Sequence, residues 1–166
     1  MDIRAAQLED AEGLLALQLS LDRETTFMML EPGERSLDVG DLRARIAQLL
    51  VSPNSTLLLA EIDGAPVGFI EAEGGEYRRT RHVAHLALGV LAAYRRRGVG
   101  TSLLETMDDW ARSHGVRRLE LSVMSDNEPA IALYRKAGYQ VEGTRSGSIL
   151  REGRFVDGLA MAKFLA

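Results

Sequence analysis

The sequence predicts a mixed α/β protein with a central, partly parallel sheet of six to seven strands flanked by about four helices. Residues 83–124 read as strand, helix and strand, which fits one crossover between two parallel strands. Residues 56–73 read as two strands joined at Asp63-Gly64, a strong hairpin signal. Two segments near the start have helical spacing. The length of 166 residues fits a single domain spanning residues 1–166.

In the first half of the chain, apolar residues recur at helical spacing over Gln7–Ser20 and again over Leu37–Leu50. We expect both segments to be helices, the second with Ser36 as its N-cap. The stretch between them, Asp22–Ser36, shows no clean period. The predicted strands of this half are Met1–Ala6, Thr56–Ile62 and Val67–Glu73.

The second half begins with a predicted buried strand at Val83–Val90. The helix predicted for Val99–His114 is amphipathic, and the pattern places Asp108 on its outer face. A shorter helix, Glu128–Ala137, follows a segment rich in N-cap residues and ends at Gly138. The remaining predicted strands are Arg118–Met124, Tyr139–Gly143 and Phe155–Phe164.

Composition excludes several functional classes. Hydrophobic residues make up 46% of the chain and charged residues 27%, as in a folded globular protein. The net charge of −4 and the pI near 5.4 argue against nucleic acid or an anionic membrane as a partner. There is no cysteine, and the three histidines lack metal-ligand spacing, so we expect no disulfide, cysteine nucleophile or metal. The first residues do not resemble a signal peptide, so we expect a cytoplasmic protein.

A basic turn with two glycines follows the buried strand and opens the next helix. Its residues are Arg95-Arg96-Arg97-Gly98-Val99-Gly100-Thr101. Glycine lets a backbone crowd a ligand, and a helix N-terminus attracts phosphate. A P-loop is excluded because no Lys follows Gly100, and a dinucleotide fingerprint is excluded because Leu103 replaces the third glycine. The remaining alternative is a basic surface turn that caps an ordinary helix.

Arg95-x-x-Gly98-x-Gly100 after an apolar strand resembles the acetyl-coenzyme A (acetyl-CoA) signature of the GNAT superfamily of N-acetyltransferases. The resemblance extends from about Val83 to Tyr139. It implies that backbone amides of the turn hold the pyrophosphate, and that the backbone near Leu88 to Val90 pairs with the pantetheine arm. The implied coenzyme-binding residues are Leu88, Val90, Arg95, Arg96, Arg97, Gly98, Val99, Gly100, Thr101 and Asn127.

A second motif resembles the other GNAT signature. It reads Asn127-x-x-Ala130-x-x-Leu133-Tyr134-x-x-x-Gly138-Tyr139. The resemblance implies that Asn127 hydrogen-bonds the pantetheine arm and that Tyr134 protonates the departing thiolate. A tyrosine with a pKa near ~10 holds its proton at neutral pH and can act as this acid. The other interpretations are a core tyrosine and a plain N-cap.

The sequence offers three candidates for the base that accepts the amine proton. Several family members carry Glu or His four or six residues before the position of Val90, where this chain has Leu86 and Ala84. His85 lies on the opposite face by strict alternation, unless a bulge shifts it. Glu71 and Glu73 on the neighbouring strand could act through water. The candidate catalytic residues are therefore Tyr134, His85 and Glu71.

In the family, the segment between the first two helices binds part of the acceptor. Here Met28 offers an adaptable apolar contact, and Glu31 or Glu34 could attract a cationic amine. Arg78, Arg79 and Arg81 equally allow an amine that bears a carboxylate. The same residues also fit an ordinary surface loop. The resemblance further allows a homodimer.

The sequence thus predicts an acetyl-CoA-dependent N-acetyltransferase that acts on a primary amine of a small molecule or peptide by direct attack. No serine occupies a nucleophile elbow, which disfavours a covalent enzyme intermediate. One rival is a non-catalytic acyl-CoA-binding regulatory domain of the same fold. The other is a basic-loop nucleic-acid binder, which the acidic pI disfavours.

Overall fold

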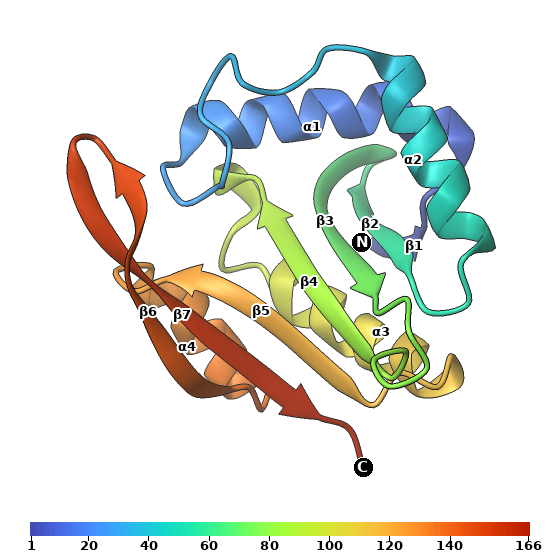
Figure 1. Ribbon diagram of the computed structural model, residues 1–166. Helices are drawn as coiled ribbons and strands as arrows, with labels where there is room; N and C mark the ends of the chain where they lie inside the picture. Colours follow the sequence, from blue (N-terminus) through green and yellow to red (C-terminus); the bar gives the residue numbers. More distant parts are fainter.

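The computed structural model covers residues 1–166 and contains a seven-stranded sheet with four α-helices, as predicted (Figure 1). The helices are α1 (Ala11–Glu24), α2 (Val39–Val51), α3 (Val99–Ser113) and α4 (Glu128–Lys136). The strands are β1 (Asp2–Ala5), β2 (Thr56–Ile62), β3 (Ala65–Gly74), β4 (Val83–Val90), β5 (Arg118–Met124), β6 (Gln140–Arg151) and β7 (Arg154–Phe164). None of the helices combines the length and the hydrophobicity needed to cross a bilayer.

The strands are ordered β1-β2-β3-β4-β5-β7-β6, and all neighbours are antiparallel except β4 and β5. The parallel pair is short: β4 pairs with β5 only at Val83, Ala84 and His85. Beyond these residues the two strands diverge, which is visible at the centre of Figure 1. The sheet therefore opens at its middle.

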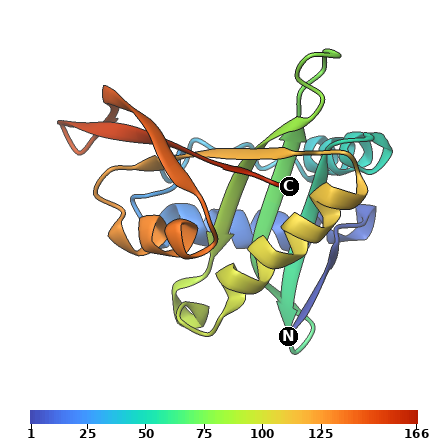
Figure 2. The same ribbon diagram turned by 90° about the horizontal axis from the view of Figure 1, so that it is seen from below.

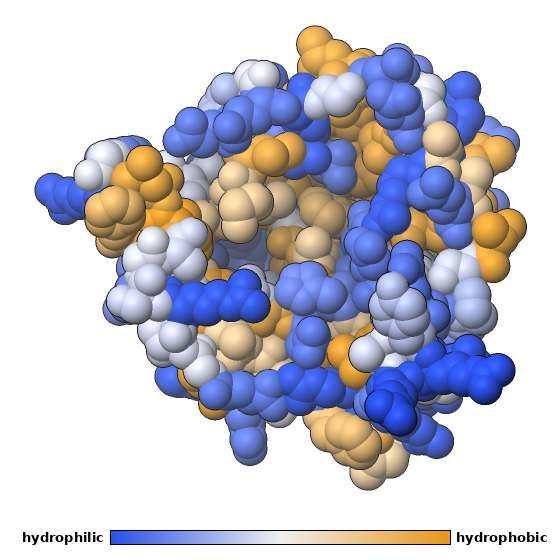
Figure 3. Space-filling model, in the orientation of Figure 1, coloured by the Kyte–Doolittle hydropathy of each residue, from blue (hydrophilic) through white to orange (hydrophobic).

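The two faces of the sheet carry separate cores. On one face α1 and α2 pack over residues such as Leu57, Leu59 and Phe69. On the other face lie α3 and α4, which run along the same side of the sheet in Figure 2. The end of the β6–β7 hairpin projects beyond the other strands of the sheet (Figure 2). The surface facing the viewer in Figure 1 is hollowed between α1 and this hairpin (Figure 3).

Several element boundaries differ from the sequence prediction. The first helix begins four residues late because Leu8–Asp10 forms a 3₁₀ turn. The second helix begins at Val39, and its N-cap is Asp38, whose carboxylate accepts hydrogen bonds from the amides of Gly40 and Asp41. The prediction that Ser36 caps this helix was therefore wrong. The hairpin strands are also longer than predicted, since β6 continues to Arg151.

Asp108 was predicted on the outer face of α3 but is buried, because it forms an ion pair with Lys163 of β7. The second carboxylate oxygen of Asp108 has no hydrogen-bond partner, and neither does the buried hydroxyl of Tyr139. Lys163 also lies over the Tyr139 ring. Helical periodicity alone cannot identify such a buried charge, because its partner comes from a distant strand.

Candidate active site

The turn between β4 and α3 presents a run of free amide hydrogens. A 3₁₀ turn, η2 (Ala92–Tyr94), precedes it, and Gly98 begins α3 without a side-chain cap. The main-chain N–H groups of residues 96–101 make no hydrogen bond of good geometry within the protein. Arg96 and Gly98 both have positive φ values, 59° and 81°. Six consecutive donors at a helix N-terminus form a suitable site for an anion.

The two motif glycines serve different purposes. Gly98 is needed for its conformation, since a Cβ there would meet no atom within 4 Å but φ is left-handed. Gly100 leaves room for α4, because a Cβ there would lie 2.9 Å from Cδ2 of Leu133 and that side chain would have to shift. The structure therefore attributes the second glycine to helix packing, whereas the sequence suggested close approach of a ligand for both.

The β4 backbone presents unpaired groups next to this turn. Leu91 N–H donates to Val67 and Gly75 N–H donates to Val83, so the odd-numbered residues of β4 bond to β3. The main-chain groups of Leu88 and Val90 therefore point toward β5, which has already diverged. Both residues were predicted to meet the pantetheine arm, and the register turns their amides toward the opening.

The arginines of the turn do not all face the free amides. The Arg95 Nε group donates to the carbonyl of Val90 over 3.3 Å, and its guanidinium lies 3.9 Å from the Glu24 carboxylate. Arg97 lies over the ring of Tyr94, with 5.3 Å from the guanidinium carbon to the ring centroid. The Arg95 side chain thus already occupies a carbonyl that the coenzyme was expected to use.

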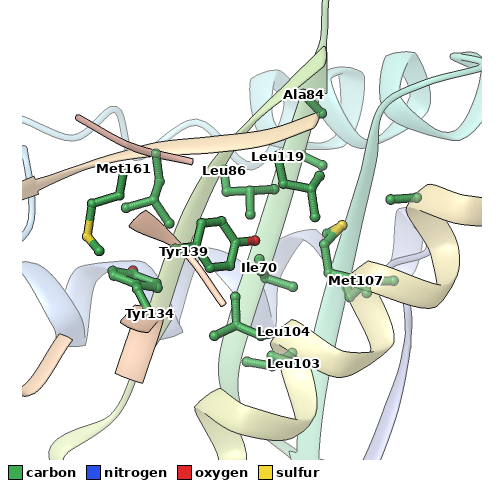
Figure 4. Packing of buried hydrophobic residues seen from close by; sticks show 14 of the residues in the cluster. Ile70, Ala84, Leu86, Leu103, Leu104, Met107, Leu119, Tyr134, Tyr139 and Met161 are labelled. Atoms are coloured by element: carbon green, nitrogen blue, oxygen red, sulfur yellow. The ribbon is translucent and has the colours of Figure 1, made fainter. Parts of the chain in front are cut away.

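Asn127 is the N-cap of α4 and Tyr134 lies on this helix, on the α3 side of the sheet. The Asn127 side-chain oxygen accepts a hydrogen bond from Ala130 N–H over 3.4 Å, so it caps α4 while its amide nitrogen has no protein partner. The Tyr134 ring is buried edge-on against Tyr139, with 5.9 Å between ring centroids. Figure 4 shows the two rings adjacent, with Tyr139 toward the middle of the core.

The Tyr134 hydroxyl has the properties expected of a proton donor. It makes no hydrogen bond within the protein and, unlike the Tyr139 hydroxyl, it is not fully buried. Burial of the side chain raises the pKa of Tyr134 to about 12, because the phenolate would lose its hydration. The phenol therefore stays protonated at neutral pH.

The candidate bases lie on the other face of the sheet. β3 and β4 pair without a bulge, so His85 alternates strictly and points away from the α3 core. It stands between Glu73 and Glu120, in the part where β4 and β5 are still paired. Glu71 lies beside Ala87, closer to the opening, and Arg45 of α2 holds one of its carboxylate oxygens over 2.6 Å. Tyr134 and His85 are thus separated by the sheet.

The predicted acceptor residues belong to the loop between α1 and α2. Met28 packs against the α1–α2 core, whereas Glu31 is exposed. The Glu34 carboxylate accepts a hydrogen bond from Glu31 N–H over 2.7 Å, so it already stabilises the turn. No three His, Asp or Glu side chains gather in a way that could hold a metal ion.

Sequence patterns did not identify Arg151, which lies at the end of β6 and contacts three other segments. Its guanidinium pairs with Asp126 just before Asn127, donates to the Met124 sulfur over 3.4 Å and lies over Phe27 of the α1–α2 loop. Hydrogen bonding from Arg151 lowers the pKa of Asp126. Arg151 therefore joins the hairpin to both the α1–α2 loop and the turn that carries Asn127.

A sequence model of the acetyltransferase (GNAT) family matches residues 20–139, which include the free-amide turn, the diverging strands and Tyr134. The chain belongs to this GNAT family. It is therefore an acetyl-CoA-dependent N-acetyltransferase, as the two motifs predicted. The relatives of this chain are named as acetyltransferases, so they support neither the regulatory-domain alternative nor the nucleic-acid-binding alternative.

Among the relatives, an L-amino acid N-acetyltransferase of Escherichia coli is 38% identical over 115 residues, 67% of this chain and 69% of that protein. A mycothiol acetyltransferase of Clavibacter sepedonicus is 33% identical over 111 residues, but the match spans only 34% of its length. The structure of a GNAT-family acetyltransferase from Streptococcus pneumoniae superposes with a TM-score of 0.95 at 30% identity, over 99% of both chains.

A Salmonella typhimurium protein solved with its cofactor acetyl-CoA shares the fold, with a TM-score of 0.88 at 20% identity over 99% of this chain and 94% of that one. That protein thus carries acetyl-CoA on the same fold. The mixed sheet with one parallel pair and four helices, predicted from the sequence, is the GNAT fold.

Proposed function

We propose that this GNAT protein transfers the acetyl group of acetyl-CoA to a primary amine by direct nucleophilic attack. The observation that carries the proposal is the run of six free amide hydrogens, residues 96–101, beside the unpaired edge of β4. The amides suit the diphosphate, and the edge suits the amides of the pantetheine arm. Asn127, at the start of α4, has a free side-chain amide nitrogen to donate to the same arm.

The thioester carbonyl gains negative charge when the amine attacks. A main-chain N–H of Leu88 or Val90, pointing into the opening, is suited to stabilise that oxygen. When the tetrahedral species collapses, the C–S bond breaks and sulfur keeps the electron pair. Tyr134 then donates its phenolic proton to the thiolate. Burial raises the pKa of Tyr134 to about 12, so the hydroxyl, which has no protein partner, still carries its proton at neutral pH when the thiolate forms.

The attacking amine must be neutral and must lose a proton after attack. Glu71 suits this role better than His85, because it lies beside Ala87 at the opening and one of its carboxylate oxygens is free. His85 stands where β4 and β5 are still paired, about 10 Å along the strand from Leu88 at ~3.3 Å per residue. Either group would act through water from the acceptor face.

The acceptor enters on the face opposite α3, where α1, its following loop and the hairpin surround a hollow (Figure 3). An L-amino acid is our first choice of acceptor, because the 38% identical relative is named for that substrate class. Arg145 of β6 is exposed and has no carboxylate partner within the protein, so we propose it as the residue that binds the carboxylate. Met28, Glu31 and Glu34 remain proposed contacts on the opposite rim.

The proposal is tested by calorimetry with acetyl-CoA, followed by an amine panel of amino acids, polyamines, aminoglycosides and peptides. Tyr134→Phe should lower kcat by at least about 100-fold while the Kd for acetyl-CoA changes by less than about twofold. Tyr139→Phe removes a hydroxyl from the same core and should keep full activity, since that group bonds to nothing. Equal turnover of Tyr134→Phe and wild type would exclude Tyr134 as the acid.

A further inference from the structure

Glu24, the last residue of α1, contacts η2, the 3₁₀ turn between β4 and the free amides of residues 96–101. Its carboxylate accepts a hydrogen bond from Ala92 N–H over 2.6 Å, although 68 residues separate them in sequence. The same carboxylate lies 3.9 Å from the Arg95 guanidinium. Ala92 begins η2, the short 3₁₀ turn that leads directly into the free amides of residues 96–101.

The C-terminal end of α1 also packs closely against β4. A Cβ built on Gly89 would lie 2.7 Å from Cδ1 of Leu21 and 2.9 Å from Cε1 of Phe69, so only glycine lets the helix come this close. Leu21 is 1% exposed, which leaves it little room to move. Glu24, one helical turn further along α1, is therefore held at a fixed position beside η2.

We propose that Glu24 is a positioning residue for the diphosphate-binding turn, an inference that rests on the coenzyme site proposed above. By fixing the first amide of η2, the carboxylate determines where the following donors begin. The Arg95 guanidinium lies 3.9 Å from the same carboxylate, and an ion pair at this distance between two partly exposed side chains contributes little. In this proposal Glu24 acts through its hydrogen bond with Ala92 N–H and has no direct role in binding the diphosphate or in the reaction.

Two ligands separate this role from a general structural one. Acetyl-CoA carries the diphosphate, whereas S-acetylpantetheine lacks it but keeps the thioester arm. Glu24→Ala in the full-length protein should raise the Kd for acetyl-CoA about tenfold, equivalent to about 1.4 kcal/mol. The Kd for S-acetylpantetheine should stay within twofold of wild type. Glu24→Gln keeps an oxygen acceptor for Ala92 N–H and should restore affinity for acetyl-CoA to within about threefold.

Ala92→Pro removes the donor from the other side of the same bond. Leu91 has φ −55° and ψ 140°, which suits a residue before proline, and proline is favoured at the first position of a helical turn. We expect Ala92→Pro to weaken acetyl-CoA binding as Glu24→Ala does, and the double variant to be no worse than either single one. Glu12→Ala, an exposed change on the same helix, is the control and should bind acetyl-CoA normally.

The outcomes distinguish the two proposals. If wild type and Glu24→Ala bind acetyl-CoA equally well, Glu24 does not position the turn, and the coenzyme site stands. If Glu24→Ala loses affinity for both ligands to the same extent, the effect is a general distortion and the positioning role is also refuted. If the wild-type protein binds no acetyl-CoA, the proposed coenzyme site itself is refuted.

Discussion

Gly100→Ala tests whether the second motif glycine is required by packing. The added methyl would lie 2.9 Å from Leu133 Cδ2, whereas carbon atoms in good contact are about 3.5 to 4.0 Å apart. The shortfall is about 0.6 to 1.1 Å. Overpacking of this kind costs about 1 to 3 kcal/mol, and the better helix propensity of alanine returns about 1 kcal/mol. We therefore expect a net loss of about 0 to 2 kcal/mol of stability.

A double-mutant cycle with Leu133→Ala isolates the clash. Removing the Leu133 methyl groups should relieve it, so the two changes together should be less harmful than their sum by about 1 to 2 kcal/mol. Urea unfolding measures these free energies. Titration with acetyl-CoA should show weaker binding by Gly100→Ala, because the Gly100 and Thr101 amides move with the displaced helix start, and recovery in the double variant.

Gly13→Ala provides the matched control. Gly13 also lies in a helix, α1, but its built Cβ is 3.5 Å from the Pro66 side chain, an ordinary contact. This change should be neutral or stabilise the protein by up to about 1 kcal/mol. If Gly100→Ala behaves like Gly13→Ala, or if the Gly100 and Leu133 changes are additive within about 0.5 kcal/mol, the packing explanation is wrong.

Three further predictions concern the buried pair, the tyrosine and a helix cap. Lys163→Met leaves the buried Asp108 carboxylate unpaired and should lower the free energy of unfolding in urea by about 2 to 4 kcal/mol. Adding Asp108→Leu should recover most of this loss, and no recovery would refute the argument. Burial raises the pKa of Tyr134 to about 12, above the value near ~10 of an unfolded chain, so folding favours the protonated form. Stability should thus be unaffected by this group below pH ~10 and should fall by up to about 3 kcal/mol between pH ~10 and ~12; an equal fall in Tyr134→Phe would contradict this. Asp38→Ala should cost about 1 kcal/mol and Ser36→Ala much less; equal melting temperatures of the two variants would count against Asp38 as the cap of α2.

The regular elements could be predicted because their signals are local. The ranges predicted for Thr56–Ile62, Val83–Val90 and Arg118–Met124 agree with β2, β4 and β5 residue for residue, since alternation and flanking turns define each strand. The second helix was placed two residues early because Ser36 and Asp38 both have side chains that can cap a helix. The choice depends on which oxygen reaches the first free amides, and this is a matter of backbone geometry.

In the candidate site, too, some parts could be predicted from local signals and others could not. The free-amide turn and Tyr134 could be located from motif spacing, because both lie within short segments. Contacts between distant segments could not: 68 residues separate Glu24 from Ala92, and 55 separate Asp108 from Lys163. The order of the strands brings these residues into contact, and no short window of sequence encodes the strand order. Arg151 was missed for this reason, since its partners come from β5, the following turn and the α1–α2 loop.

The proposed use of main-chain donors for the coenzyme has a consequence for how this protein can change over time. Amide hydrogens are common to every residue except proline, so replacing the side chain of Arg96 or Thr101 does not delete them. The acceptor side, as proposed above, is lined by side chains of the α1–α2 loop and the hairpin. Mutations can therefore redirect the choice of amine while the donor half of the reaction is inherited unaltered.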